Sequence, residues 1–156
     1  MSVAIRVATA DEVPILNAIR TSVRENHMSL EQMAAYGITP EVIAEVITTT
    51  GRGFIASVDG VDAGIAIAEA KAGCIYAMFV LPDHEGMGLG RLLMAEAERF
   101  LFEAGCENVW LEAGATEGLR AHGFYAHLGW RRDGLMPDGQ LRFVKSREEL
   151  VRGMTA

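Results

Sequence analysis

A glycine-rich turn is the part of the sequence whose residue types could do chemistry. Glycine occupies every second position from Gly86 to Gly90, between an apolar run that ends at Val80 and an amphipathic stretch that begins at Arg91. Glycines let backbone N–H groups approach a ligand with no Cβ in the way. The start of a helix adds unpaired N–H donors and a partial positive charge. The pattern therefore predicts an anion site suited to a pyrophosphate.

Two common phosphate-binding motifs do not fit this turn. A Walker loop needs Gly-Lys followed by Ser or Thr, and the sequence contains no such run. The dinucleotide fingerprint needs a third glycine three places after the second, where this chain, counted from Gly86, has Arg91. The residues alone leave open a tight turn that binds no ligand, or a nucleotide-binding module of another kind.

Composition narrows the remaining classes of partner. The net charge of -7 argues against a nucleic-acid partner, because such binding relies on clustered cations. Cys74 and Cys106 are the only cysteines and lack metal-ligand spacing, so we expect reduced thiols and no metal site. No secretory signal and no run of 18 apolar residues is visible, so we expect a cytoplasmic protein without membrane contact.

The elements around the turn predict one domain, residues 1–156, of the α/β (α+β) class. Alternating or continuous apolar runs predict strands at 4–8, 53–58, 63–69, 75–80, 108–113 and 141–145. Asp59-Gly60 predicts a hairpin between the second and third strands. Start and stop signals predict helices from about Thr9, from Pro40 to about Thr49, and at 91–104 and 118–128. Residues 24–38 are irregular, and a polar tail follows the last strand.

Two segments carry a resemblance to a known family. Residues 80–93 (VLPDHEGMGLGRLL) resemble the cofactor motif of the GNAT superfamily of acyl-CoA-dependent N-acyltransferases. Residues 121–130 (AHGFYAHLGW) are similar to its Ala-x-x-Phe-Tyr-x-x-x-Gly-Phe segment. Within the superfamily, residues 24–26 (REN), 84–86 (HEG) and 123–125 (GFY) resemble a bacterial group whose acceptors are mostly unassigned. The resemblance implies a mixed, mostly antiparallel sheet flanked by helices. It also implies an N-acetyltransferase that moves an acetyl group from acetyl-CoA directly to an amine in a ternary complex.

The resemblance also implies where coenzyme A lies. Backbone groups of Met78, Phe79 and Val80 should pair with the pantetheine arm like an added strand, and one of these amides should polarise the thioester carbonyl. Amides of the glycine turn should hold the pyrophosphate, with two arginines as candidates for the adenosine phosphates. The expected cofactor-binding set is Met78, Phe79, Val80, Glu85, Gly86, Met87, Gly88, Leu89, Gly90, Arg91 and Arg120.

Acyl transfer from a thioester to an amine needs a neutral amine, a polarised carbonyl and a protonated leaving thiolate. The resemblance assigns protonation of the sulfur to Tyr125. Glu69, Glu112 and Tyr76 are the candidate bases. Either carboxylate could instead be a solvated strand-end residue, and a base acting through water stays open.

The resemblance places the acceptor pocket around the first two helices and their connection. Arg24, Glu25 and Asn26 are the substrate-binding candidates there, together with Tyr76 on the fourth strand. Glu25 could hold a cationic amine and Arg24 a carboxylate, or the cluster could simply order a loop. The acceptor is expected to be a small-molecule amine or a protein or peptide amine, and the family pattern also allows a homodimer.

Three positions depart from the family pattern. Glu85 stands where Gln or Arg is usual, and a carboxylate facing pyrophosphate would be repelled by about 1 kcal/mol or more unless its side chain faces solvent. Gly118 replaces a usual Asn, and Cys74 replaces a frequent carboxylate. These departures motivate one alternative, a catalytically degenerate acyl-CoA-binding sensor.

Overall fold

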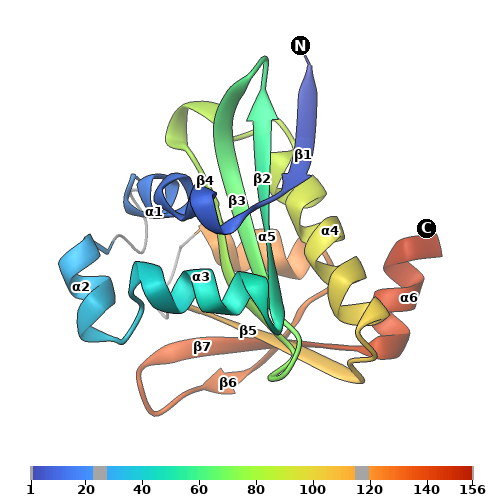
Figure 1. Ribbon diagram of the computed structural model, residues 1–156. Coiled ribbons are helices and arrows are strands. Elements are labelled where there is room, and N and C mark those ends of the chain that lie inside the picture. The colour runs from blue at the N-terminus through green and yellow to red at the C-terminus, as the bar shows by residue number, and fades with distance from the viewer. Residues whose placement is uncertain (1, 23–27, 115–119, 156) are drawn as a thin grey trace.

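A computed structural model describes residues 2–22, 28–114 and 120–155 (Figure 1). Within these residues, strands form one seven-stranded sheet in the order β1-β2-β3-β4-β5-β7-β6. β4 and β5 pair in parallel, and every other neighbouring pair is antiparallel. Helices cover both faces of the sheet. This confirms the expected fold class, a mixed and mostly antiparallel sheet flanked by helices.

The strands agree with the apolar runs of the sequence, with one addition. They are β1 (Val3–Val7), β2 (Gly51–Val58), β3 (Val61–Glu69), β4 (Cys74–Val80), β5 (Asn108–Gly114), β6 (Arg131–Leu135) and β7 (Gln140–Ser146). The expected hairpin joins β2 and β3 through Asp59 and Gly60, whose φ angles are 50° and 85°. Positive φ at both central residues is what a tight two-residue hairpin turn needs.

Side-chain caps mark the starts of several of the helices. They are α1 (Val13–Thr21), α2 (Leu30–Ala35), α3 (Pro40–Thr48), α4 (Leu89–Glu103), α5 (Arg120–His127) and α6 (Arg147–Thr155), with 3-10 turns η1 (Ala10–Glu12) and η2 (Pro82–His84). At α3 the Thr39 hydroxyl accepts the Val42 N–H at 3.2 Å, and Pro40 occupies the first turn. Both are standard helix-start devices.

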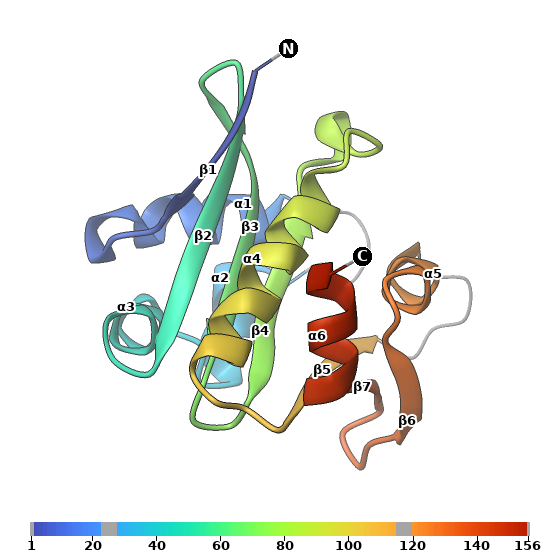
Figure 2. The same ribbon diagram turned by 90° about the vertical axis from the view of Figure 1, so that its right-hand side faces the viewer.

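The strands β2 and β3 at the centre of the sheet are buried on both faces, which explains why they read as nearly continuous apolar runs. Ile55 and Ile65 pack with Leu16 of α1 and Ile47 of α3 on one face. A second core cluster, which includes Leu93 of α4, lies on the other face. Figure 2 shows α4 and α6 side by side on this second face, opposite α1 and α3.

Three elements differ from the expectation. α2 lies inside the irregular stretch and starts with a capping box in which Ser29 accepts the Gln32 N–H at 3.1 Å. α6 replaces the expected polar tail. Ser146 and Glu149 form another capping box, and Leu150 is the only fully buried residue among those of the helix whose burial is described. The strand β6 was not predicted, because its residues are mostly exposed and its sequence shows no alternation of apolar and polar residues. Short or polar elements such as these give weak periodicity signals.

The sheet splits between β4 and β5. Their parallel ladder has a single register pair, Cys74 with Trp110, and the Trp110 N–H donates to the Gly73 carbonyl at 3.0 Å. Beyond this pair the strands diverge, and Figure 1 shows β5 and β7 running across the direction of β1–β4. The β3–β4 register shifts at Ala68, which leaves Tyr76 as an extra residue in β4. Such a bulge increases local twist and helps to open the gap.

Candidate functional site

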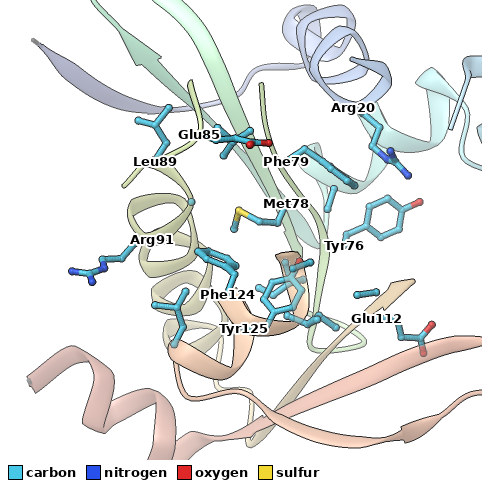
Figure 3. A pocket seen from close by; sticks show the side chains of 18 of the residues that line it. Arg20, Tyr76, Met78, Phe79, Glu85, Leu89, Arg91, Glu112, Phe124 and Tyr125 are labelled. Carbon is cyan, nitrogen blue, oxygen red and sulfur yellow. The ribbon is translucent and has the colours of Figure 1, made fainter. Parts of the chain in front are cut away.

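A cavity of about 780 Å³ lies in the gap between β4 and β5 (Figure 3). Its walls come from β4, the turn before α4, the first turn of α4, β5 and α5, with further residues from α1 and the segment around α2. This volume is typical of a small-molecule or cofactor site. Residues from both motifs of the sequence line this one cavity.

The edge of β4 facing the cavity is built from backbone groups. The Leu81 N–H donates to the Ala63 carbonyl at 2.8 Å, so the backbone groups of Leu81 point toward β3. Because backbone groups alternate along a strand, those of Phe79 also point to β3, and those of Met78 and Val80 point toward the cavity. An extended ligand could therefore pair with Met78 and Val80, while Phe79 contributes its ring.

The glycine turn after β4 is shaped by backbone angles that favour glycine. Gly86 and Gly88 have φ of 80° and 82°, and Gly88 is the N-cap residue of α4. No side chain of the described residues caps this helix. Its first N–H groups are therefore not used inside the helix and lie at the cavity wall. The backbone thus forms the expected anion cradle, with the positive end of the helix dipole behind it.

Gly90, in the first turn of α4, allows close packing between two helices. A Cβ there would lie 3.0 Å from the Phe124 Cζ atom, so glycine lets α5 approach α4 closely. His84, before the turn, also lines the cavity, and its buried Nδ1 has no hydrogen-bond partner among the described residues. It is a candidate ligand contact that sequence reasoning missed.

The charged side chains near the cradle do not supply its positive field. Glu85 is exposed, lines the cavity and lies beside Leu89, while the Arg91 side chain extends away from the cavity (Figure 3). Met87 is also exposed, and it does not line the cavity. Arg120 begins α5, but its side chain is outside the described part of the chain. Anion binding here would rely on peptide N–H groups.

Tyr125 lies in α5 and lines the cavity from the side opposite β4 (Figure 3). Its ring packs between Phe124 and Phe143, with centroid distances of 5.4 and 5.5 Å. Burial raises the pKa of Tyr125 to about 12, since a buried phenolate would lose its hydration. The hydroxyl therefore stays protonated, and able to donate, throughout the physiological range.

A buried polar cluster fixes the end of α5 that follows Tyr125. The Lys145 ammonium donates to Glu98 at 2.9 Å and to the Leu128 carbonyl at 2.8 Å. The Trp130 indole N–H donates to the other Glu98 oxygen at 3.2 Å, and the Trp130 backbone N–H donates to the Tyr125 carbonyl at 3.0 Å. This cluster, Glu98–Lys145–Trp130, ties α4, β7 and the end of α5 together. Sequence analysis had no signal for it, because the partners are 32 and 47 residues apart.

The structure separates the two candidate carboxylates. Glu112 lines the cavity from β5 and pairs with Arg142 at 2.6 Å. Glu69 does not line it, because the Glu69 carboxylate accepts the N–H groups of Lys71 and Ala72, at 3.0 and 2.7 Å, in the β3–β4 turn. The structure therefore places the Glu69 carboxylate in the β3–β4 turn and not in the cavity lining, and its role as a base stays a prediction.

The cavity end beneath α1 holds a residue that sequence reasoning missed. Arg20 lines the cavity with only 9% of its surface exposed, and its guanidinium lies 4.1 Å above the Phe79 ring. The available signal was a cation on the apolar face of α1, next to Ile19 and four residues after Leu16. Tyr76 lines the same end, and burial, together with Cys74 nearby, raises its pKa. The predicted acceptor residues Arg24, Glu25 and Asn26 lie outside the described residues.

Other kinds of site have little support in the described ranges. These residues contain no group of three His, Cys, Asp or Glu side chains placed to hold a metal ion. Cys74 and Cys106 are both free thiols. No described helix combines the length and apolar character that a membrane crossing requires.

Three solved structures, each under 25% identical, share the fold. PaiA N-acetyltransferase of Thermoplasma acidophilum, in complex with coenzyme A, has 15% identity and a TM-score of 0.76, and the match covers 94% of this chain and 99% of that one. YncA of Salmonella typhimurium with acetyl-CoA has 14% identity and a TM-score of 0.73 (94% and 95% covered), and the spermidine/spermine N-acetyltransferase SpeG of Vibrio cholerae has 15% identity and a TM-score of 0.71 (96% and 96% covered). No curated protein sequence matches. The family model for the acetyltransferase (GNAT) family matches residues 17–130, more than half of the chain. The chain therefore belongs to the GNAT family of acetyltransferases.

Proposed function

We propose that residues 1–156 act as one cytoplasmic catalytic domain that transfers an acetyl group from acetyl-CoA to an amine by direct transfer in a ternary complex. One observation carries the proposal: the cavity-facing edge of β4, the glycine cradle of α4 and Tyr125 line a single cavity. The coenzyme A and acetyl-CoA in the PaiA and YncA structures support the cofactor. The acceptor is a small-molecule amine or a protein or peptide amine.

The residues of the cavity fit coenzyme A in two places. The backbone groups of Met78 and Val80 would pair with the amides of the pantetheine arm, as a strand pairs with a sheet edge. The N–H groups of residues 86–91 would bind the pyrophosphate, with His84 beside them. Because these contacts come from the backbone, the protein can bind the anionic cofactor despite its overall negative charge.

Acetyl-CoA, when bound, supplies a thioester carbonyl activated toward an amine. The amine nitrogen forms a bond to the carbonyl carbon, and the carbon–sulfur bond breaks. In our proposal the Tyr125 hydroxyl donates a hydrogen bond to the departing sulfur. Full proton transfer from a phenol with a pKa of about 12 to a thiolate near 8.5 would cost about 5 kcal/mol. Tyr125 therefore stabilises the thiolate, and the proton released by the amine returns to the sulfur.

The proton of the attacking amine needs an acceptor in the cavity. An alkyl ammonium is almost wholly charged at neutral pH, so a neutral amine must be generated in the site. We propose that Glu112, held by Arg142, ends a water relay that takes this proton. Tyr76 is the second candidate, from the opposite strand. Glu112→Gln and Tyr76→Phe, measured side by side for kcat, distinguish the two.

The test follows free thiol during incubation of the protein with acetyl-CoA and a panel of amines. The expected result is thiol release that depends on the amine and falls strongly in Tyr125→Phe. Tight acetyl-CoA binding without release above the Tyr125→Phe background would favour an acyl-CoA sensor instead. Absence of coenzyme A binding in calorimetry at millimolar ligand would overturn both functions.

A further inference from the structure

A carboxylate at the cavity wall keeps one of its two oxygens open. Glu112 lines the cavity from β5, and Arg142 of β7 donates to it twice, from Nη2 at 2.6 Å and from Nε at 3.1 Å. Both bonds end on the same oxygen, Oε2. The other oxygen, Oε1, has no hydrogen-bond partner among the described residues, and it is not a buried atom. Arg142 therefore holds Glu112 and leaves one oxygen to the cavity.

The pairing of β5 with β7 brings these side chains together. Glu112 and Arg142 are directly opposite in the antiparallel register, so they share a face of the sheet. Trp110 lies two residues before Glu112 in β5 and therefore on the same face. The guanidinium carbon of Arg142 lies 4.2 Å from the centroid of the Trp110 ring. The ring thus supports the cation that holds Glu112.

The Trp110 side chain is itself fixed from outside the β5–β7 pair. Its indole N–H donates to the Ala72 carbonyl at 3.0 Å, and the Trp110 backbone N–H donates to the Gly73 carbonyl at 3.0 Å. Both carbonyls belong to the turn between β3 and β4. A continuous set of contacts therefore runs from this turn through Trp110 and Arg142 to Glu112.

Such support matters for a group that accepts a proton, because a displacement of about 1 Å can lower a rate about 100-fold. The Arg142 and Glu112 side chains are 31% and 18% exposed, and a partly exposed ion pair by itself holds two long side chains only weakly. Building on the proposed function, we propose that Trp110 and Arg142 are positioning residues that keep Oε1 of Glu112 turned toward the acceptor amine. The amine then loses its proton through the relay water to Oε1, while Oε2 stays bound to Arg142.

The first experiment is a double-mutant cycle on kcat, measured with saturating acetyl-CoA and the amine that gives the fastest thiol release. Glu112→Gln should lower kcat about 100-fold, as for the loss of a general base. Arg142→Gln and Trp110→Leu should each lower kcat about tenfold, because Glu112 is then misplaced. In the Glu112→Gln protein, neither change should lower kcat further. Losses that multiply would show that the two residues act only on the fold, and would overturn the inference.

The second experiment uses a conservative variant and a matched control. Trp110→Phe should keep more of kcat than Trp110→Leu, because a phenyl ring still supports the cation. Phe102→Leu is the control, since the Arg147 guanidinium carbon lies 4.0 Å from the Phe102 ring centroid and neither residue lines the cavity. The control should keep its kcat, and the Kd of coenzyme A should stay within about threefold in every variant. Equal loss of kcat in Trp110→Leu and Phe102→Leu would contradict a positioning role.

The inference and the proposed function fail in different ways. If the unmodified protein releases no thiol with any amine, both fail. If it releases thiol but Glu112→Gln keeps the kcat of the unmodified protein, only the inference fails, and Tyr76 is left as the candidate base.

Discussion

The two walls of the cavity work in different ways. The wall of β4 and α4 presents backbone groups, held by the β3–β4 ladder and by glycines with positive φ. The wall of β5, α5 and β7 presents side chains, chiefly Tyr125 and Glu112. A backbone site depends on local chain conformation, whereas a side-chain site depends on everything packed behind it.

The walls also differ in how they are attached. β4 and β5 share one register pair, so the sheet itself hardly connects the two walls. The buried Glu98–Lys145 pair provides a second connection, from α4 to β7. We therefore expect changes in the first wall to affect cofactor binding, and changes behind the second wall to affect stability and turnover.

The largest expected effect is on stability, from Lys145→Met. This change leaves the Glu98 carboxylate buried without its partner, which should lower the free energy of unfolding by about 3–5 kcal/mol in urea titrations. Because Lys145 also holds the Leu128 carbonyl, the remaining folded protein should lose kcat while its Kd for coenzyme A stays unchanged. A loss of less than 1 kcal/mol, as for an exposed pair, would contradict this role.

Tyr125→Phe should lower kcat by about 100-fold, because the leaving thiolate loses its hydrogen-bond donor. Coenzyme A affinity, measured by calorimetry, should stay within about threefold of the original, because the first wall is intact. Since the pKa of Tyr125 is about 12, kcat of the unmodified protein should show no loss from its ionisation below about pH 11. A kcat close to that of the original protein would remove Tyr125 from the mechanism.

Gly88→Ala should weaken coenzyme A binding by about tenfold, because an alanine strained at this φ of 82° shifts the first amides of α4. Gly60→Ala is a matched control: its φ is 85°, and a Cβ at either position meets nothing within 4 Å. Both variants should lose about 1–2 kcal/mol of stability. Only Gly88→Ala should change the Kd, and equal Kd values in the two variants would contradict the backbone cradle.

The smallest effect is expected for the exposed Arg131–Glu149 pair, outside the second wall. The hydrogen bond from Arg131 lowers the pKa of Glu149 to about 2 from an ordinary value of 4.5. The folded value lies below the unfolded one, so the pair stabilises above about pH 4.5 and is lost as pH falls toward 2. The Arg131 side chain is 59% exposed, so Arg131→Ala should cost less than about 1 kcal/mol at pH 7. Urea titrations of both proteins between pH 2 and 7 measure this difference in the free energy of unfolding, and a difference above about 1 kcal/mol at pH 7 would contradict the prediction.

The sequence by itself determined local features of the chain, among them the glycine turn of the first wall. The Asp59-Gly60 hairpin, the Thr39 cap and the glycine turn before α4 depend on residues a few positions apart. Backbone angles and caps act over that range, so residue types reveal them. Both family motifs belong to segments of this kind, and they predicted the fold class correctly.

Only the tertiary structure decided which side chains meet in the cavity. It places the Glu69 carboxylate in the β3–β4 turn and Glu112 at the cavity wall, and it brings Arg20 of α1 over the Phe79 ring of β4. It also joined Glu98 to Lys145 across 47 positions of the chain. Such contacts arise from the opening of the sheet and the packing of distant elements, which no local pattern encodes, because burial and pairing energies depend on three-dimensional neighbours.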